Sequence, residues 1–197
     1  MLFRSGGFTS FIDSSIEWKE VVKYTDFINI MSYDLVHGFS KESGHHTPLY
    51  STASQIESTD HAVSLLIQKG VPAEKLVIGS AFYGRVFKVD EHYPAGLYKP
   101  CVFQYTFQFK NAEKELSALN GYERYYDDTA KASYAVNKSS NLIATFDDEK
   151  SVVAKTRYAI NRRLGGIMFW QLCDDKVKGG LLNAIYQTIS SDKYREH

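Results

Sequence analysis

The chain has 197 residues, and its 23 lysines and arginines balance 23 aspartates and glutamates, so the formal net charge is zero. This length suits one domain with a sizeable core. The balanced charge gives no basic surface for nucleic acid and no acidic excess typical of disorder. No apolar stretch approaches the ~18 residues of a membrane helix, so we expect neither a nucleic-acid nor a membrane partner.

The two cysteines, Cys101 and Cys173, make no disulfide framework and have no metal-ligand spacing. They are most simply free thiols, although the sequence does not decide whether they pair. We do not expect the opening Met1-Leu-Phe-Arg to belong to a secretory signal, because no apolar segment follows it.

Most of the chain alternates strand and helix patterns. Nearly continuous apolar runs indicate strands covered on both faces, as in a parallel sheet, and apolar residues at helical spacing after a capping residue indicate helices. In chain order we expect a strand ending near Phe8, a helix over residues 16–24 capped by Ser14 or Ser15, a strand over 27–33, a helix over 59–69 capped by Ser58, a strand over 76–82, a strand over 142–146, a helix from 147 that Gly165 stops, a strand over 166–172 and a helix over 181–189.

Residues 86–140 break this pattern: they are rich in Tyr and Phe and are interrupted by Pro94, Gly96, Pro100 and Gly121. We predict an inserted lobe, a small antiparallel sheet with a short helix near residues 112–119.

Strand–helix–strand units imply parallel pairing with right-handed crossovers. Three clear strands, and a fourth near Phe8, are too few for a closed barrel of about eight strands. The chain is therefore either a small open sheet or part of a barrel, and the lack of a Gly-rich phosphate turn after any strand favours the barrel. We predict an α/β fold, the C-terminal half of a (β/α)8 TIM barrel with an α+β lobe between its last two strands. Residues 1–85 form the partial barrel, 86–146 the lobe, and 147–197 the last barrel strand with its flanking helices.

Three of the apolar runs end in aromatic or polar side chains. Barrel strands place their functional side chains in the same way, at the C-terminal end of the barrel. These endings are Met31-Ser-Tyr33-Asp34, Tyr83-Gly-Arg85 and Phe169-Trp170.

Side chains alternate along a strand, so Tyr33 shares a face with Met31 and Asn29, while Ile28 and Ile30 face the helices. In the same way, Trp170 shares a face with Met168. The same alternation places Gly79 and Ala81 beneath Tyr83. Small residues under a large ring leave room for a ligand, and we expect one cavity above these strands.

In their order and spacing, with the lobe between the last two strands, these motifs resemble the C-terminal half of a glycoside hydrolase family 18 chitinase. The resemblance extends from about Phe8 to Ile189 and includes His45-His-Thr-Pro-Leu-Tyr50 and Tyr126-Asp-Asp-Thr-Ala-Lys131. It implies hydrolysis of β-1,4-linked N-acetylglucosamine polymers with retention, in which the substrate's own acetamido oxygen attacks, an exception to the two-carboxylate scheme. It implies no cofactor and no metal.

The family's general acid is a Glu in an Asp-x-x-Asp-x-Asp-x-Glu motif on the fourth barrel strand, and this chain contains no such motif. Asp147-Asp-Glu is only a superficial match. The resemblance therefore implies a missing N-terminal half of the barrel as partner, and we expect the chain alone to be inactive.

Carried over to this sequence, the resemblance gives two residues catalytic roles. Tyr33 would donate a hydrogen bond to the attacking acetamido oxygen, and Asp34 would bind sugar hydroxyls or the amide at the cleaved bond. The substrate-binding residues would be Met31 against the acetamido methyl, Tyr83 and Arg85 against the sugars, and Trp170 as the apolar floor. The segment Gln171-Leu-Cys173 departs from the family's usual pattern. This departure concerns only the expected structure at the rim of the cavity.

Each of these residues also has an ordinary structural interpretation. Tyr33 and Trp170 suit a core, and Arg85 could pair with an acid of the lobe. His45 and His46 suit loop packing better than a metal site, because no other ligand stands at a suitable spacing. The pairs Asp127-Asp128 and Asp174-Asp175 suit turns.

Two alternatives to the chitinase stay open. One is a non-catalytic chitin-oligosaccharide-binding protein on the same fold, since a fold and a pocket do not guarantee catalysis. The other is an endo-β-N-acetylglucosaminidase with the same mechanism. The family implies an extracellular or cell-envelope location. We also expect the strand over residues 27–33 to lack neighbours on one side, which favours association.

Overall fold

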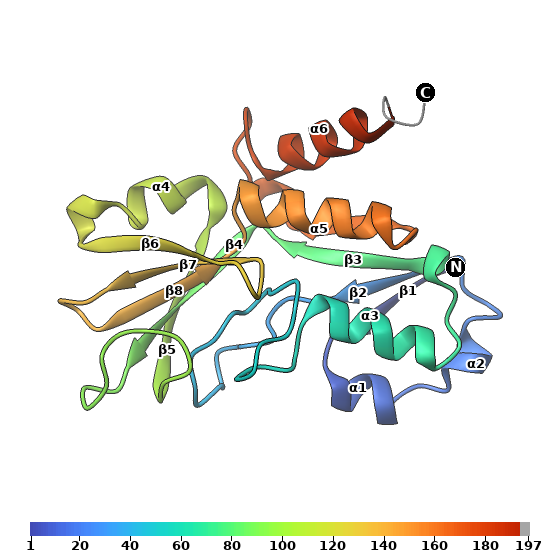
Figure 1. Ribbon diagram of the computed structural model, residues 1–197, viewed down its shortest axis with the longest axis horizontal. Helices are drawn as coiled ribbons and strands as arrows, with labels where there is room; N and C mark the ends of the chain where they lie inside the picture. The colour runs from blue at the N-terminus through green and yellow to red at the C-terminus, as the bar shows by residue number, and fades with distance from the viewer. Residues whose placement is uncertain (194–197) are drawn as a thin grey trace.

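A computed structural model describes residues 1–193 as two sheets that follow one another along the molecule, with helices on the parallel one (Figure 1). The α/β architecture of a parallel sheet plus an antiparallel sheet agrees with the sequence. In these residues no helix is both long and apolar enough to cross a bilayer.

The parallel sheet has four strands in the order β1-β2-β3-β9, and every neighbouring pair is parallel. The strand expected near Phe8 is present as β1, two residues before it. The strands are β1 (Leu2–Gly6), β2 (Phe27–Met31), β3 (Leu76–Ala81) and β9 (Gly166–Trp170). The expected edge position of the strand over residues 27–33 is wrong, because β1 pairs with β2 and leaves β1 and β9 at the edges.

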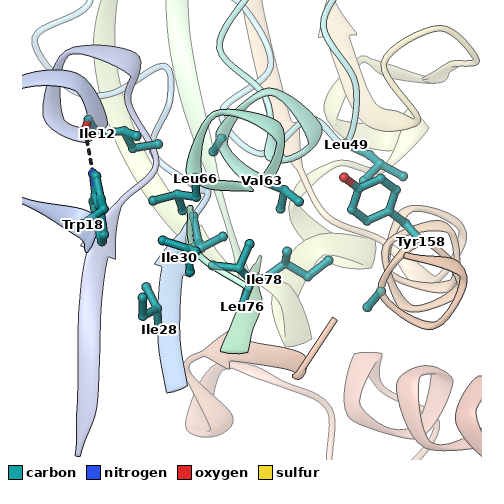
Figure 2. Close-up of a cluster of buried hydrophobic side chains, with 13 residues drawn as sticks. Ile12, Trp18, Ile28, Ile30, Leu49, Val63, Leu66, Leu76, Ile78 and Tyr158 are labelled. Atoms are coloured by element: carbon teal, nitrogen blue, oxygen red, sulfur yellow. Dashed lines mark hydrogen bonds between the residues drawn. The ribbon is translucent and has the colours of Figure 1, made fainter. Parts of the chain in front are cut away.

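Helices cover one face of this sheet. Ile28 and Ile30 of β2 and Leu76 and Ile78 of β3 are fully buried, and α1, α2, α3 and α5 supply side chains to the same cluster (Figure 2). This confirms the alternation that assigned Ile28 and Ile30 to the helix side. The helices are α1 (Thr9–Ser14), α2 (Trp18–Val21), α3 (Thr59–Gln68), α4 (Ala112–Glu115), α5 (Glu149–Asn161) and α6 (Leu181–Lys193).

The first helical region differs from the expected helix over residues 16–24. Ser14 ends α1 instead of capping a helix, and α2 is a single turn beginning at Trp18. The reason is Trp18, which is buried against the sheet and donates its indole N–H to the Ile12 carbonyl at 2.7 Å. Holding that ring under α1 breaks the run into two short helices. By contrast, Ser58 caps α3 as expected, accepting from the His61 amide.

The antiparallel sheet has five strands in the order β5-β4-β8-β7-β6, and it is the lobe predicted from the Tyr- and Phe-rich segment. Its first strand begins at Tyr83, so Tyr83 and Arg85 do not close β3. The short helix near residues 112–119 is α4 followed by a 3-10 turn at Ala118–Asn120. The strands are β4 (Tyr83–Val89), β5 (Cys101–Gln108), β6 (Tyr122–Asp127), β7 (Ala132–Asn137) and β8 (Leu142–Phe146).

The start and end of α5 involve different residues from those expected. Asp148 is the N-cap, whereas Asp147 is fully buried and pairs with Lys155 at 2.7 Å. The helix ends with Arg163 at a φ of 51°, not at Gly165. Gly165 is needed for another reason, since a Cβ there would lie 2.5 Å from the Glu74 carbonyl oxygen.

Cys101 is buried, Cys173 is exposed, and both are free thiols.

Candidate functional site

A cavity of about 490 Å³ lies at the C-terminal ends of the parallel strands, on the face away from the helices. It brings together five of the six predicted site residues, namely Met31, Tyr33, Asp34, Tyr83 and Trp170. The remaining wall comes from Arg4 of β1, Asn29 of β2, and Met168 and Phe169 of β9.

The ring of Tyr33 packs edge-on against the ring of Tyr83, with centroids 6.2 Å apart. It also packs against β3, where a Cβ on Gly79 would lie 2.8 Å from a Tyr33 ring carbon and 2.8 Å from the Ile30 carbonyl. The expectation that Gly79 leaves room for a ligand beneath Tyr83 is therefore wrong. Gly79 leaves room for Tyr33 itself.

Asp34 directly follows Tyr33 and has a φ of 60°, a left-handed conformation that aspartate tolerates better than most residues. Its Oδ1 accepts hydrogen bonds from Tyr83 Oη at 2.7 Å and Arg85 Nε at 2.7 Å. His46 Nδ1 lies 3.6 Å from the same oxygen. One strand of the lobe sheet, β4, and the loop after β2 thus hold this carboxylate at the cavity wall.

Arg85 is the sixth predicted residue, and it is not among the residues that line the cavity. Its guanidinium carbon lies 5.7 Å from the centre of the Tyr83 ring and 5.6 Å from that of Phe103. The sequence left open whether Arg85 pairs with an acid of the lobe; its partner is Asp34, which follows β2 of the parallel sheet. A direct contact between Arg85 and a sugar stays a prediction.

The two adjacent site residues have opposite protonation states at neutral pH. Burial, followed by the charge of Asp34, raises the pKa of Tyr33 to about 12, so its hydroxyl stays protonated. Burial also acts to raise the pKa of Asp34, but the contacts with His46, Arg85 and Tyr83 outweigh it and hold that pKa well below its usual range. The cavity therefore offers a hydroxyl donor next to a carboxylate acceptor.

Trp170 supplies an open aromatic face, since 49% of its surface is exposed. The alternation predicted Met168 on the same face, and Met168 does line the cavity. The Phe169 ring stacks on the buried Phe82 ring with centroids 4.6 Å apart, which fixes β9 against the start of the lobe. Trp170 is thus an exposed residue of the cavity and not a core residue.

Several other polar residues have structural partners. His45 is buried and its Nε2 lies 3.1 Å from Asp127 Oδ2, which is loop packing as the sequence favoured. Asp175 accepts the backbone N–H groups of Leu181 and Leu182 at the start of α6. The described residues contain no cluster of three or more His, Cys, Asp or Glu side chains arranged to hold a metal ion.

A larger hollow of about 620 Å³ lies beside α6, and Asp175 supplies the carboxylate among its lining residues. Backbone N–H groups already donate to both oxygens of that carboxylate, and none of the six predicted site residues lines this hollow.

Sequence reasoning missed two residues near the site. Arg4 of β1 lines the cavity beside Asn29, its register partner in β2. The alternation of Phe3 and Arg4 would have placed Arg4 there if the sequence had given the bounds of β1. His46 was assigned to loop packing, and no local pattern shows that it approaches Asp34.

This arrangement suits a ligand with an apolar ring face and amide or hydroxyl groups. The Tyr33 hydroxyl can donate to a carbonyl oxygen, Asp34 can accept from an N–H or O–H, and Trp170 can stack on the ring. Within the described residues, Asp34 is the only carboxylate that lines the cavity. The cavity therefore has the groups that bind and orient, but no second acid.

Comparison with known proteins identifies the family. The model of glycosyl hydrolases family 18 matches residues 4–175. Chitinase A1 of Niallia circulans is 33% identical over 195 residues, covering 90% of this chain and 28% of that protein. Chitotriosidase-1 of Mus musculus is 34% identical, covering 87% of this chain and 39% of that protein.

Solved structures agree. A glycoside hydrolase family 18 N-acetylglucosaminidase from Paenibacillus barengoltzii superposes with a TM-score of 0.85 at 35% identity, covering 95% of this chain and 55% of that one. Chitinase ChiA74 from Bacillus thuringiensis gives a TM-score of 0.88 at 26% identity, covering 96% of this chain and 35% of that one. The chain thus spans about a quarter to just over half the length of these relatives. It belongs to glycoside hydrolase family 18.

Proposed function

We propose that this chain supplies the C-terminal half of the substrate site of an enzyme that hydrolyses β-1,4-linked N-acetylglucosamine polymers. The observation that carries the proposal is the shared cavity, in which a protonated Tyr33, an ionised Asp34 and an open Trp170 face the same space. An N-acetylated sugar has a carbonyl for the first, an N–H and hydroxyls for the second, and a ring face for the third.

In the proposed reaction the substrate's acetamido oxygen attacks the anomeric carbon, and the configuration is retained. Tyr33 donates its hydroxyl hydrogen to that oxygen and stabilises the charge that develops there. Asp34 accepts from the sugar, and Trp170 excludes water beneath the reacting ring. Proton delivery to the leaving oxygen requires a carboxylic acid besides Asp34, and the described residues that line the cavity include none.

We propose further that the remaining strands of a (β/α)8 barrel lie against this chain. The parallel sheet has two free edges in the described part, β1 and β9, and its cavity face is open. Four more parallel strands joining both edges would close a barrel of about eight. Those strands would bring the general acid to the cavity.

A second candidate is a chitin-oligosaccharide-binding protein without hydrolytic activity. It is favoured by one specific observation, that Asp34 is the sole carboxylate lining the cavity in the described residues. An endo-β-N-acetylglucosaminidase would use the same groups on a different glycan. Because chitin is an extracellular polymer, we propose that the whole protein acts outside the cell or in its envelope.

The test compares this chain with the complete translation product of its gene. We expect both to bind N-acetylglucosamine oligomers, the complete product more tightly, and only the complete product to hydrolyse them. In that product Tyr33→Phe should lower kcat about 100-fold or more, the loss typical of a donor to developing charge, while Trp170→Ala should mainly raise KM.

Three outcomes decide between the candidates. Binding without turnover in the complete product would select the binding protein, and cleavage of a glycopeptide in preference to a chitin oligomer would select the endoglycosidase. Turnover by the 197-residue chain alone, or no binding by either product, would contradict the proposal.

A further inference from the structure

The hydrogen bonds of Asp34 are all on one oxygen. Tyr83 Oη and Arg85 Nε donate to Oδ1, and His46 Nδ1 approaches the same atom at 3.6 Å. No described residue donates to Oδ2. Since Asp34 lines the cavity, Oδ2 is the oxygen left to accept a hydrogen bond from a ligand.

His46 is the unexplained member of this group. Its side chain is fully buried, and neither ring nitrogen has a hydrogen-bond partner among the described residues. An imidazole always has at least one N–H, and leaving a buried polar group unpaired costs about 1–3 kcal/mol. At a buried position where no polar group is needed, an apolar side chain would be more stable, so we expect this imidazole to have a specific role.

The backbone around His46 is fixed, so its approach to Asp34 is a property of the fold. The His46 amide donates to Thr145 Oγ1 at 3.0 Å, and its carbonyl accepts from the Leu35 amide at 3.0 Å. Leu35 directly follows Asp34, so the two residues are tied together through the main chain. The imidazole also packs on the Tyr83 ring, with centroids 5.3 Å apart.

The charged and titratable groups that face His46 come from three elements. Asp34 follows β2, Tyr83 and Arg85 belong to β4, and Asp147 follows β8. Burial lowers the pKa of His46, and the two carboxylates do not reverse that effect. The imidazole is therefore neutral near pH 7, with one N–H to direct.

We propose that His46 is a positioning residue for Asp34: its Nδ1–H is the third donor on Oδ1, and this fixes the carboxylate with Oδ2 turned toward the cavity as the acceptor for a ligand N–H or O–H. The ligand class rests on the proposed function, but the effect of His46 on Asp34 does not. A carboxylate fixed in this way distinguishes sugars that present a donor at this point from those that do not.

The first test needs no ligand and uses the whole chain. Imidazole ¹⁵N spectra should show the proton of His46 on Nδ1. In His46→Phe, which keeps a buried ring and removes the donor, the ¹³C signal of the Asp34 carboxyl should titrate at a higher pH than in the unaltered chain. His46→Gln, which retains an N–H, should restore part of the difference.

His45→Phe is the matched control. His45 is the adjacent residue and is also buried, but its partner is Asp127, so its replacement should leave the Asp34 titration unchanged. A purely structural role for the loop would make both phenylalanine variants shift Asp34 alike. That result, a proton on Nε2, or an unshifted Asp34 in His46→Phe would overturn the proposal.

The second test measures binding of tri-N-acetylchitotriose by calorimetry. His46→Phe should weaken binding about 2- to 10-fold, as expected for one hydrogen bond, and His46→Gln should recover most of the lost affinity. Equal affinity in the unaltered chain and in His46→Phe would contradict the role of His46 in binding. If Asp34 shifts as predicted but no form binds the sugar, the proposed function fails while the inference on His46 stands.

Discussion

The most informative single perturbation is Lys155→Met, which removes the cation from a fully buried ion pair. Lys155 Nζ donates to both oxygens of Asp147 at 2.9 and 2.7 Å, and neither side chain is exposed. Asp147 Oδ2 also accepts from Ser80 Oγ and the Ala81 amide at the end of β3. The pair therefore ties α5 and the end of β8 to the strand that precedes Tyr83.

Breaking a buried pair from one side costs about 3–5 kcal/mol, because the other charge is left uncompensated. Asp147 would keep its hydrogen bonds from Ser80, Ala81, Ser151 and Thr47, so we expect the lower end, about 3 kcal/mol. With a urea m-value of about 2 kcal/mol/M, this moves the unfolding midpoint by about 1.5 M. Urea titrations followed by fluorescence and circular dichroism measure this shift.

The loss should depend on pH. Burial acts to raise the pKa of Asp147, but the charge of Lys155 and several hydrogen bonds lower it overall. In the unaltered chain the carboxylate therefore stabilises the fold above the unfolded pKa, and this stability is lost as the pH falls through the lower folded pKa. Without Lys155 the folded pKa of Asp147 rises, so the difference between variant and unaltered chain should be largest near pH 7 and shrink toward pH 4.

Arg157→Met is the control, because Arg157 lies exposed on the same helix and makes no ion pair with any described residue. It should change stability by less than about 0.5 kcal/mol. The double variant Asp147→Asn/Lys155→Met, which removes both charges, should recover about half of the loss. A cost for Lys155→Met no larger than that of Arg157→Met would refute the account of this pair.

Three further predictions concern the cavity. Gly79→Ala should displace Tyr33, since the new Cβ would lie 2.8 Å from its ring. Overpacking of this kind costs at least ~1.4 kcal/mol, so binding of N-acetylglucosamine oligomers should weaken about tenfold or more. Unchanged calorimetric affinity would contradict this packing. The ring ¹³C signal of Tyr33 should titrate near the pKa of about 12 and at lower pH in Asp34→Asn, where the carboxylate charge is gone; an unshifted signal would show that the two groups do not interact. Arg85 helps to lower the pKa of Asp34, so the unaltered chain should keep its sugar affinity at pH 4. Arg85→Gln should lose affinity between pH 7 and pH 4 as Asp34 protonates. Parallel pH profiles of the two forms would exclude an effect of Arg85 on Asp34.

Alternation along the strands was enough to predict the buried face of the parallel sheet. Ile28 and Ile30 lie on the helix side, and Met31 and Tyr33 line the cavity. The reason is that a period of two is a local property of the strand and does not depend on which strand is its neighbour.

The end of β3 could not be predicted, because residues 76–85 have no turn residue where the chain leaves one sheet for the other. The break is made by distant partners. The Phe82 amide donates to the Trp170 carbonyl, and the Phe82 carbonyl accepts from the Phe109 amide. Only the folded chain brings these groups together, so Tyr83 was assigned to the wrong sheet although its place at the site was predicted.

The buried ion pair of Lys155 and Asp147 could not be predicted for a similar reason. Val152, Thr156 and Ala159 lie at helical spacing on the buried face of α5. Lys155 lies within that face, which is a signal that it is buried and paired. Its partner Asp147 was expected to begin the helix, whereas the N-cap is Asp148 and the acidic residue of the first turn is Glu149.

The central claim is that Tyr33, Asp34, Tyr83 and Trp170 form one cavity that recognises an N-acetylated sugar. The most direct measurement is NMR mapping of the chain with tri-N-acetylchitotriose and with cellotriose, which has the same linkage without acetamido groups. The account predicts that the signals of Tyr33, Tyr83 and the Trp170 indole move with the first sugar and little with the second. Equal shifts with both sugars, or shifts elsewhere with these three signals unmoved, would contradict it.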